Sequence, residues 1–169
     1  MSKDTMRPAA TSLLILCLAA TGPAFARSTD RSQPMDIDAD STDALLGDDA
    51  VTTMNGNVRI RQGTLEVDAD RAEIHRAGGD ISQIVLTGAP ARLRQVSDTG
   101  EPMDARAQRV VYDRTSEIMV LTGAVLIEQP RGSVRGETLK YNLDTGRIEG
   151  GGDGQGISMR ILPKTAPAN

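Results

Sequence analysis

The stretch Met119-Val-Leu-Thr-Gly-Ala-Val-Leu-Ile-Glu-Gln129 contains the tetrapeptide Leu-Thr-Gly-Ala, which also occurs at Leu86–Ala89. Each copy follows apolar residues that favour strands, and Met54-Asn-Gly-Asn57 is a looser third copy. The central glycines of the three copies, at positions 56, 88 and 123, are 32 and 35 residues apart. Self-similarity at this spacing indicates one supersecondary unit that is stacked several times.

Around these copies the dominant hydrophobic period is two. Apolar and polar residues alternate in four stretches: Met35–Asp40, Asn57–Arg61, Leu65–Asp70 and Leu139–Leu143. This alternation is typical of strands with one dry and one wet face. Turn-forming residues recur at short intervals: Asn55-Gly56, Gln62-Gly63, Gly78-Gly79-Asp80, Gly88, Thr99-Gly100, Gly123, Arg131-Gly132 and Thr145-Gly146. The sequence therefore predicts an all-β protein of many short antiparallel strands.

The N-terminus has the three parts of an export signal. Lys3 and Arg7 supply a positive region, Leu13–Ala20 a short apolar core, and Ala24-Phe25-Ala26 a cleavage site. The apolar run is shorter than the roughly 18 residues that a membrane span needs. We therefore expect residues 1–26 to be cleaved as a signal peptide and the mature chain to be exported; an uncleaved membrane anchor is the alternative.

The rest of the chain has the length of one ordinary domain, which we expect over residues 27–162. A glycine-rich break at Gly150–Gly156 precedes a last possible strand at Ile157–Leu162. Because Pro163 cannot donate to a strand ladder, residues 163–169 are predicted to be a disordered tail.

The composition excludes several classes of protein. Cys17, the single cysteine, lies in the signal, so the mature chain has no disulfide and no cysteine metal site. Removing the signal takes away two basic residues and one acidic residue, so the formal net charge falls from −4 to −5. This mildly acidic chain lacks the basic footprint of a nucleic-acid-binding protein. Its two remaining aromatic residues, Tyr112 and Tyr141, are too few for a base-stacking platform.

The search for catalytic chemistry is negative. Asp36-x-Asp38-x-Asp40 begins like a calcium loop, but Ser41 and Gly47 occupy the positions where glycine and a bidentate glutamate are required. His75 is the sole histidine, so a two-histidine metal motif cannot be built. The chain also lacks a Gly-x-x-x-x-Gly-Lys phosphate loop. We therefore expect no enzyme activity, no catalytic or metal-binding residues and no cofactor.

An ordered series of segments resembles the OstA-like domain of the LptA family, the periplasmic bridge proteins of lipopolysaccharide transport in Gram-negative bacteria. The series comprises Met54–Arg71, Val111–Asp113, Met119–Gln129 and Val134–Tyr141, and the similarity runs from about Gln33 to Glu149. The resemblance implies a twisted, open antiparallel β-jelly roll, a periplasmic location, and an apolar groove that receives the acyl chains of lipopolysaccharide.

The alternation nominates the inward residues that would form the wall of such a groove. These residues are Met35, Ile37, Val58, Ile60, Leu65, Val67, Ile84, Leu86, Leu93, Tyr112, Val120, Val125, Ile127, Leu139 and Tyr141. Sheltering acyl chains on an aliphatic wall would supply a large driving force, since each buried methylene is worth roughly 0.8 kcal/mol. On the residues alone, the same set could equally fill an ordinary sandwich core.

The resemblance also implies partners at the two ends of the sheet, because exposed edge strands recruit other chains. The N-terminal edge, about Met35–Asp40, would join the inner-membrane scaffold protein of the pathway or a second copy of this chain. The C-terminal edge, about Ile157–Leu162, would join the outer-membrane translocon. Such head-to-tail pairing can extend into filaments.

Three other interpretations remain open from the sequence. The membrane-anchored scaffold of the same pathway shares the fold but keeps its N-terminal helix. A structural or adhesive β-repeat protein would have a filled core. A hydrolase would use His75 with a carboxylate.

Overall fold

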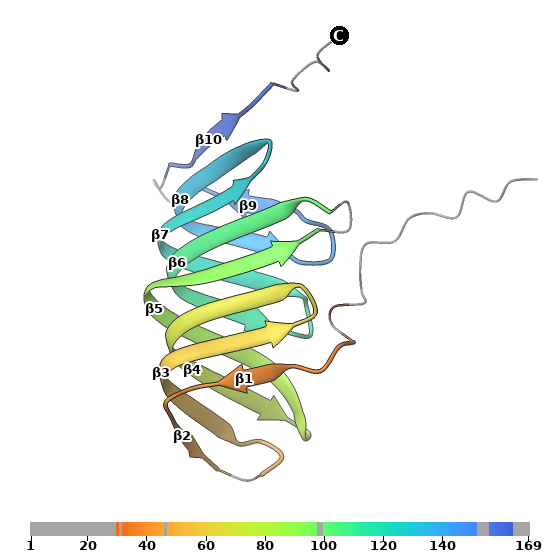
Figure 1. Ribbon diagram of the computed structural model, residues 1–169, viewed down its shortest axis with the longest axis vertical. Helices are drawn as coiled ribbons and strands as arrows, with labels where there is room; N and C mark the ends of the chain where they lie inside the picture. Colours follow the sequence, from red (N-terminus) through yellow and green to blue (C-terminus); the bar gives the residue numbers. More distant parts are fainter. Residues whose placement is uncertain (1–29, 31, 46, 98–99, 152–155, 164–169) are drawn as a thin grey trace, which may run out of the picture.

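The computed structural model describes residues 30, 32–45, 47–97, 100–151 and 156–163, and these form one antiparallel sheet. Its body consists of six long strands: β3 (Val51–Gln62), β4 (Leu65–Ala77), β5 (Asp80–Val96), β6 (Pro102–Asp113), β7 (Ile118–Gln129) and β8 (Gly132–Asn142). At one end β1 (Asp36–Asp38) and β2 (Ser41–Ala44) both pair with β3. At the other end β9 (Ile148–Gly150) and β10 (Ser158–Ile161) both pair with β8 (Figure 1). The predicted all-β, antiparallel class is confirmed.

The long strands bend near their middle, so that the sheet folds back on itself into two layers (Figure 1). Each adjacent pair from β3 to β8 changes register at the bend: between Asn55 and Val58, Asp68 and Arg71, Thr87 and Ala91, Arg106 and Arg109, and Thr122 and Val125. A change of register marks extra residues in one strand of the pair, which bend the strand and increase its twist. The aligned irregularities therefore form one continuous fold line across the sheet, which we call the spine.

The predicted turns at Gly56, Gly88 and Gly123 are wrong, because these glycines lie inside β3, β5 and β7 on the spine. Gly123 has a φ of +85° and Ala124 a φ of +47°, so two left-handed residues tilt the strand without reversing it. The strands are correspondingly longer than the sequence suggested. By contrast, the predicted turns at Gln62-Gly63, Gly78-Gly79-Asp80 and Arg131-Gly132 are confirmed as hairpin connections between long strands.

The core lies between the inner faces of the two layers. Rows of side chains in register cross each layer: Ile60, Val67, Leu93, Ala105, Ile127 and Val134 in one, and Ala72, Leu86, Val110, Leu121 and Leu139 in the other. Over the described strands, only neighbours in the sheet bring Cα atoms within 8 Å of each other. The layers therefore meet through side chains, as in a sandwich whose sheets are about 10 Å apart.

The predicted signal peptide at residues 1–26 and nearly all of the predicted tail, residues 164–169, lie outside the described residues. No described segment forms a helix that is both long enough and apolar enough to cross a membrane.

Candidate functional site

The interior between the layers brings together most of the predicted wall residues. One buried cluster contains Val58, Ile60, Leu65, Val67, Ile84, Leu86, Leu93, Tyr112, Val125, Ile127, Leu139 and Tyr141. Met35 and Ile37, from the N-terminal edge, are partly buried and pack against this cluster. The cluster extends from β3 to β8 without a break, so the interior is one continuous apolar surface.

Val120 is the one predicted wall residue that the structure places elsewhere. Its neighbours Met119 and Leu121 are buried in the cluster, whereas Val120 is half-buried and points away from it. In register it faces Val111 on one side and Lys140 on the other. The prediction failed because Met119-Val120-Leu121 is apolar throughout, so alternation could not indicate which residues face inward.

Alternation alone did not identify all residues of the buried cluster. The additional cluster members are Ala69, Ala72, Ala91, Met103, Ala105, Ala107, Val110, Met119, Leu121 and Val134. In β4 the buried residues have odd numbers up to Ala69 and even numbers from Ala72 onward, so the inward positions shift by one residue at the spine. The same shift occurs in β6 between Ala107 and Val110. A strict alternation carried along the whole strand therefore misassigns one half of it. The alanines carried a usable signal, since they occur at every second position in Ala105-Arg-Ala107.

Polar side chains from neighbouring strands cover the bends of the spine. The Asp40 carboxylate accepts a hydrogen bond from Asn57 Nδ2 at 2.8 Å, and the Asp70 carboxylate accepts one from the Ala89 backbone N–H at 3.0 Å. A Cβ atom on Gly123 would lie 2.5 Å from Gln108 Oε1, so this amide packs directly on the glycine. At the bends of β3 and β7, a glycine thus lies against a polar side chain: Gly56 against Asp40 and Gly123 against Gln108.

Two tyrosines provide the only hydroxyl groups of the buried cluster. The Tyr112 hydroxyl donates to Glu117 Oε2 at 2.6 Å, at the hairpin between β6 and β7. Burial raises the pKa of the Tyr141 hydroxyl, which keeps this group neutral over the physiological range. The wall is therefore uncharged and almost wholly aliphatic.

The two ends of the interior differ. At the N-terminal end the carboxylate of Asp30 is buried and accepts a hydrogen bond from the Thr64 hydroxyl, and Gln62 Nε2 donates to the Gln33 carbonyl at 3.1 Å. These contacts hold the segment before β1 against the β3–β4 hairpin.

At the C-terminal end β10 covers only the first part of β8 and leaves a cavity of about 290 Å³. Its apolar lining residues are Ile127, Val134, Ile148, Met159 and Ile161.

The residues considered for other chemistry are dispersed. Asp38 lies on the outer face of β1, where it forms an ion pair with Arg61 at 3.5 Å. His75 Nε2 lies 3.9 Å from Glu73 on the same strand. In the part of the chain that the structure describes, no three histidine, cysteine or carboxylate side chains are grouped as metal ligands.

The chain is similar to proteins of lipopolysaccharide transport. Residues 36–147 match the family model described as LptA/(LptD N-terminal domain) LPS transport protein. The lipopolysaccharide export system protein LptA of Escherichia coli (strain K12) is 31% identical in an alignment of 149 residues that covers 86% of this chain and 80% of the relative. Its counterpart in Haemophilus influenzae is 28% identical over 146 residues, 85% of this chain and 84% of the relative.

A solved structure has the same fold. It is the crystal structure of LptH, described as the LptA-homologous periplasmic component of the lipopolysaccharide transport device of Pseudomonas aeruginosa. The TM-score is 0.71 at 22% sequence identity, and the match covers 79% of this chain and 99% of LptH. The β-jelly-roll architecture expected from the sequence is therefore confirmed.

Proposed function

Because the chain belongs to the family of LptA and the LptD N-terminal domain, which are lipopolysaccharide transport proteins, we propose that its apolar interior shelters the acyl chains of lipopolysaccharide in the periplasm. The protein is a transport protein and not an enzyme. The observation that carries the proposal is the unbroken aliphatic cluster between the layers, which runs from β3 to β8.

The way in which the layers are joined supports this proposal. Leu93 and Leu139 are 1% and 0% exposed, so the side chains of the two layers fill the interior of the free protein. Acyl chains would enter by parting the layers, since only strands adjacent in the sheet are joined by backbone ladders. Parting the layers therefore breaks no ladder hydrogen bond. The side chains would exchange contacts with each other for contacts with acyl chains, while the acyl chains leave water at roughly 0.8 kcal/mol per methylene.

Photo-crosslinking tests this placement of the lipid. A photoreactive amino acid at Leu93 or Tyr112 should crosslink to lipopolysaccharide, and one at the partly buried Ile37 provides a position that disturbs packing less. Arg59, whose side chain is 62% exposed on the outer face, is the matched control. Crosslinks at Arg59 without crosslinks at the inner positions would exclude an interior groove and favour a filled structural core.

The partners at the ends of the sheet are also part of the proposal. The N-terminal edge, residues 35–40, would pair with the inner-membrane scaffold or with another copy, and the C-terminal edge, residues 157–162, with the outer-membrane translocon. Exposed apolar side chains on the C-terminal edge support this role: Ile157, Met159, Ile161 and Leu162. Edge pairing of this kind provides backbone hydrogen bonds, while the alternate side chains provide specificity.

Export and cleavage are tested by the mass of the mature protein. The proposal requires a periplasmic chain that begins at Arg27. Retention of Met1 in the protein isolated from cells would instead support the membrane-anchored scaffold of the same pathway.

A further inference from the structure

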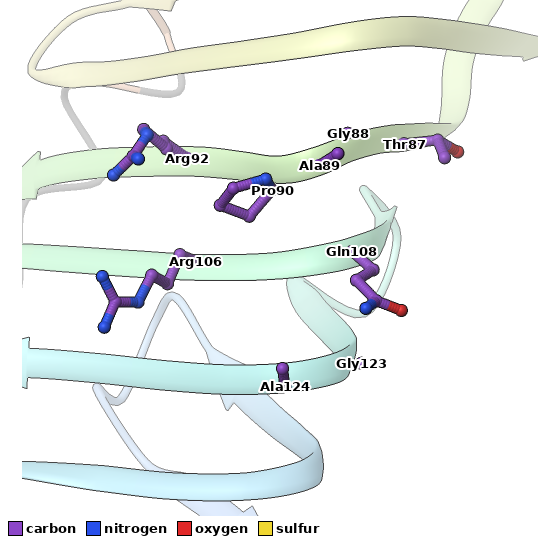
Figure 2. A pocket seen from close by; sticks show the side chains of 9 residues that line it. All are labelled: Thr87, Gly88, Ala89, Pro90, Arg92, Arg106, Gln108, Gly123 and Ala124. Atoms are coloured by element: carbon purple, nitrogen blue, oxygen red, sulfur yellow. The ribbon is translucent and has the colours of Figure 1, made fainter.

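A cavity of about 590 Å³ opens on the outer face of the sheet beside the spine, away from the buried cluster. Figure 2 shows Arg92 and Arg106 side by side at one end of this cavity and Gln108 at the other, with Pro90 between β5 and β6. The remaining lining comes from the small residues of the two Leu-Thr-Gly-Ala bends. Because the residues at these two bends have small side chains, they leave open a space that larger side chains would fill.

The two arginines lie directly opposite each other in the register of β5 and β6. Like charges that face each other across a strand pair destabilise the sheet. Other arginines of this face have carboxylate partners: Arg59 lies 3.6 Å from Asp68, and Arg94 lies 3.1 Å from Asp104. Within the described part of the chain, neither Arg92 nor Arg106 has a carboxylate oxygen within 4 Å.

Several acidic groups lie near the two arginines. Asp104, which pairs with Arg94, and Glu128 line a smaller cavity of about 120 Å³ together with both arginines. Asp68 lies opposite Arg92 in register, but its carboxylate pairs with Arg59. On the spine, Asp70 accepts the Ala89 backbone N–H at 3.0 Å, and Glu137 lies 3.5 Å from the backbone nitrogen of Ala124. Arg92 and Arg106 therefore line one end of the cavity without a carboxylate oxygen of any described residue within 4 Å, and Gln108 lines the other end (Figure 2).

We propose that this cavity is a binding site for a phosphate monoester carried on a group the size of a sugar. Paired guanidinium groups match the planar, bidentate geometry that phosphate oxygens accept, and an anion between them would relieve their repulsion. A cavity of about 590 Å³ also has room for the ring that bears the phosphate. The site lies outside the apolar interior, so the inference does not depend on the proposed lipid function.

The test is a titration of the isotope-labelled full mature protein with glucose 6-phosphate and with inorganic phosphate, followed by amide chemical shifts. We expect saturable shifts centred on the bends at residues 87–92 and 122–125. Arg92→Gln and Arg106→Gln should each weaken binding by about tenfold or more, as expected for loss of a charge-assisted hydrogen bond. Arg94→Gln is the matched control, because Arg94 lies on the same face but is paired with Asp104. The Arg94→Gln variant should bind glucose 6-phosphate as tightly as the unmodified protein does.

A second measurement separates a binding role from a structural one. Because the pair is repulsive in the free protein, Arg92→Gln should unfold at an equal or higher temperature than the unmodified protein when phosphate is absent. A binding loss together with a lower unfolding temperature in both variants would overturn the proposal, and so would a lack of saturable shifts at the bends.

The same chemistry could come from a free phosphorylated sugar or from a lipid headgroup. Sedimentation with vesicles that contain phosphatidic acid in phosphatidylcholine distinguishes these sources. Binding of glucose 6-phosphate by a protein that does not sediment with the vesicles indicates a soluble ligand. Sedimentation of the protein with the vesicles that Arg92→Gln abolishes indicates a lipid headgroup. Either result supports the site. Retention that is equal in Arg92→Gln and the unmodified protein, with no glucose 6-phosphate binding, would overturn it.

Discussion

Gly123 shows how single residues determine the bends of this sheet. Its φ of +85° lies in the left-handed region that side chains disfavour, and Gln108 of the neighbouring strand packs where a Cβ atom would lie. Gly78, in a hairpin between β4 and β5, also has a positive φ, of +59°, but has nothing within 4 Å of its Cβ position. The two glycines share the conformational constraint and differ in crowding.

Gly123→Ala should therefore destabilise the protein more than Gly78→Ala. The conformational cost is about 1–2 kcal/mol for each, because a left-handed alanine is strained. Gly123→Ala must also displace the Gln108 side chain. Denaturant midpoints of the two variants check this expectation, and equal losses of stability would contradict the packing role of Gln108.

The Asp113 carboxylate accepts hydrogen bonds in the turn between β6 and β7. The backbone N–H and hydroxyl of Ser116, followed by the backbone N–H of Thr115, donate to its carboxylate and hold its pKa below the usual value. A lowered pKa means that the folded state binds the proton less tightly than the unfolded state does. This stabilisation is fully present above the unfolded pKa of about 3.9 and is lost as the pH falls through the folded value.

Asp113→Asn should flatten the decrease in stability below about pH 4, because the amide oxygen still accepts hydrogen bonds but does not titrate. The measurement is the unfolding temperature of both proteins between roughly pH 2 and 6. An identical acid dependence in the two proteins would show that Asp113 does not contribute to it.

A substitution at Ile37 tests the proposed lipid-facing wall with little risk to folding, because Ile37 is only partly buried and belongs to a three-residue strand at the edge. Ile37→Asp would place a carboxylate against acyl chains, and desolvating this charge should weaken lipopolysaccharide binding by about tenfold or more. Asp38→Asn, on the exposed face of the same strand, should bind like the unmodified protein. Unchanged binding of a folded Ile37→Asp variant would place the lipid away from this end of the interior.

At the scale of elements, both ends of the sheet have the same construction. One long strand pairs with two short ones: β3 with β1 and β2, and β8 with β9 and β10. All four residues of β10 are exposed, and its side chains Met159 and Ile161 are 57% and 76% exposed. An edge strand presents unpaired backbone N–H and C=O groups to which another chain can pair, and the exposed Met159 and Ile161 side chains would add apolar contacts to such a pairing.

Ile161→Asp should therefore reduce the proposed head-to-tail self-association. A charge on the apolar edge would have to be desolvated in the pairing, which raises its free-energy cost. Sedimentation velocity over a range of concentrations measures the association. Val96→Asp, at a 37% exposed position at the end of β5, is the control, and an equal effect of both substitutions would argue against the edge.

At the scale of the whole molecule, the spine joins the two layers along one side while their facing surfaces touch only through side chains. Parting the layers about the spine, as the proposed lipid uptake requires, would leave the backbone ladders intact. Hydrogen exchange should show equal or greater amide protection in β4–β7 when lipopolysaccharide is bound. Lower protection along the β5–β6 ladder would instead mean that the lipid enters between strands.

Much of this architecture could be predicted because it depends on local chemistry. Alternation with aliphatic residues predicts half-buried strands, and a pair such as Gln62-Gly63 between two alternating runs predicts a hairpin. Ile60, Val67 and Leu93 were correctly placed inside for that reason. The family resemblance added the jelly roll, which alternation by itself does not specify.

The all-β class, the aliphatic and uncharged inner face and the positions of several hairpins follow from the amino-acid sequence. Three features follow from the packing of the strands instead: Gly56, Gly88 and Gly123 bend strands and do not end them, Val120 points away from the interior, and Arg92 faces Arg106. A glycine permits a left-handed backbone in a turn and in a bulge alike. Whether a given glycine forms a turn or a bulge depends on the register with the neighbouring strands and on the polar side chains that cover the bend. The register and these side chains both involve residues that are distant in the sequence.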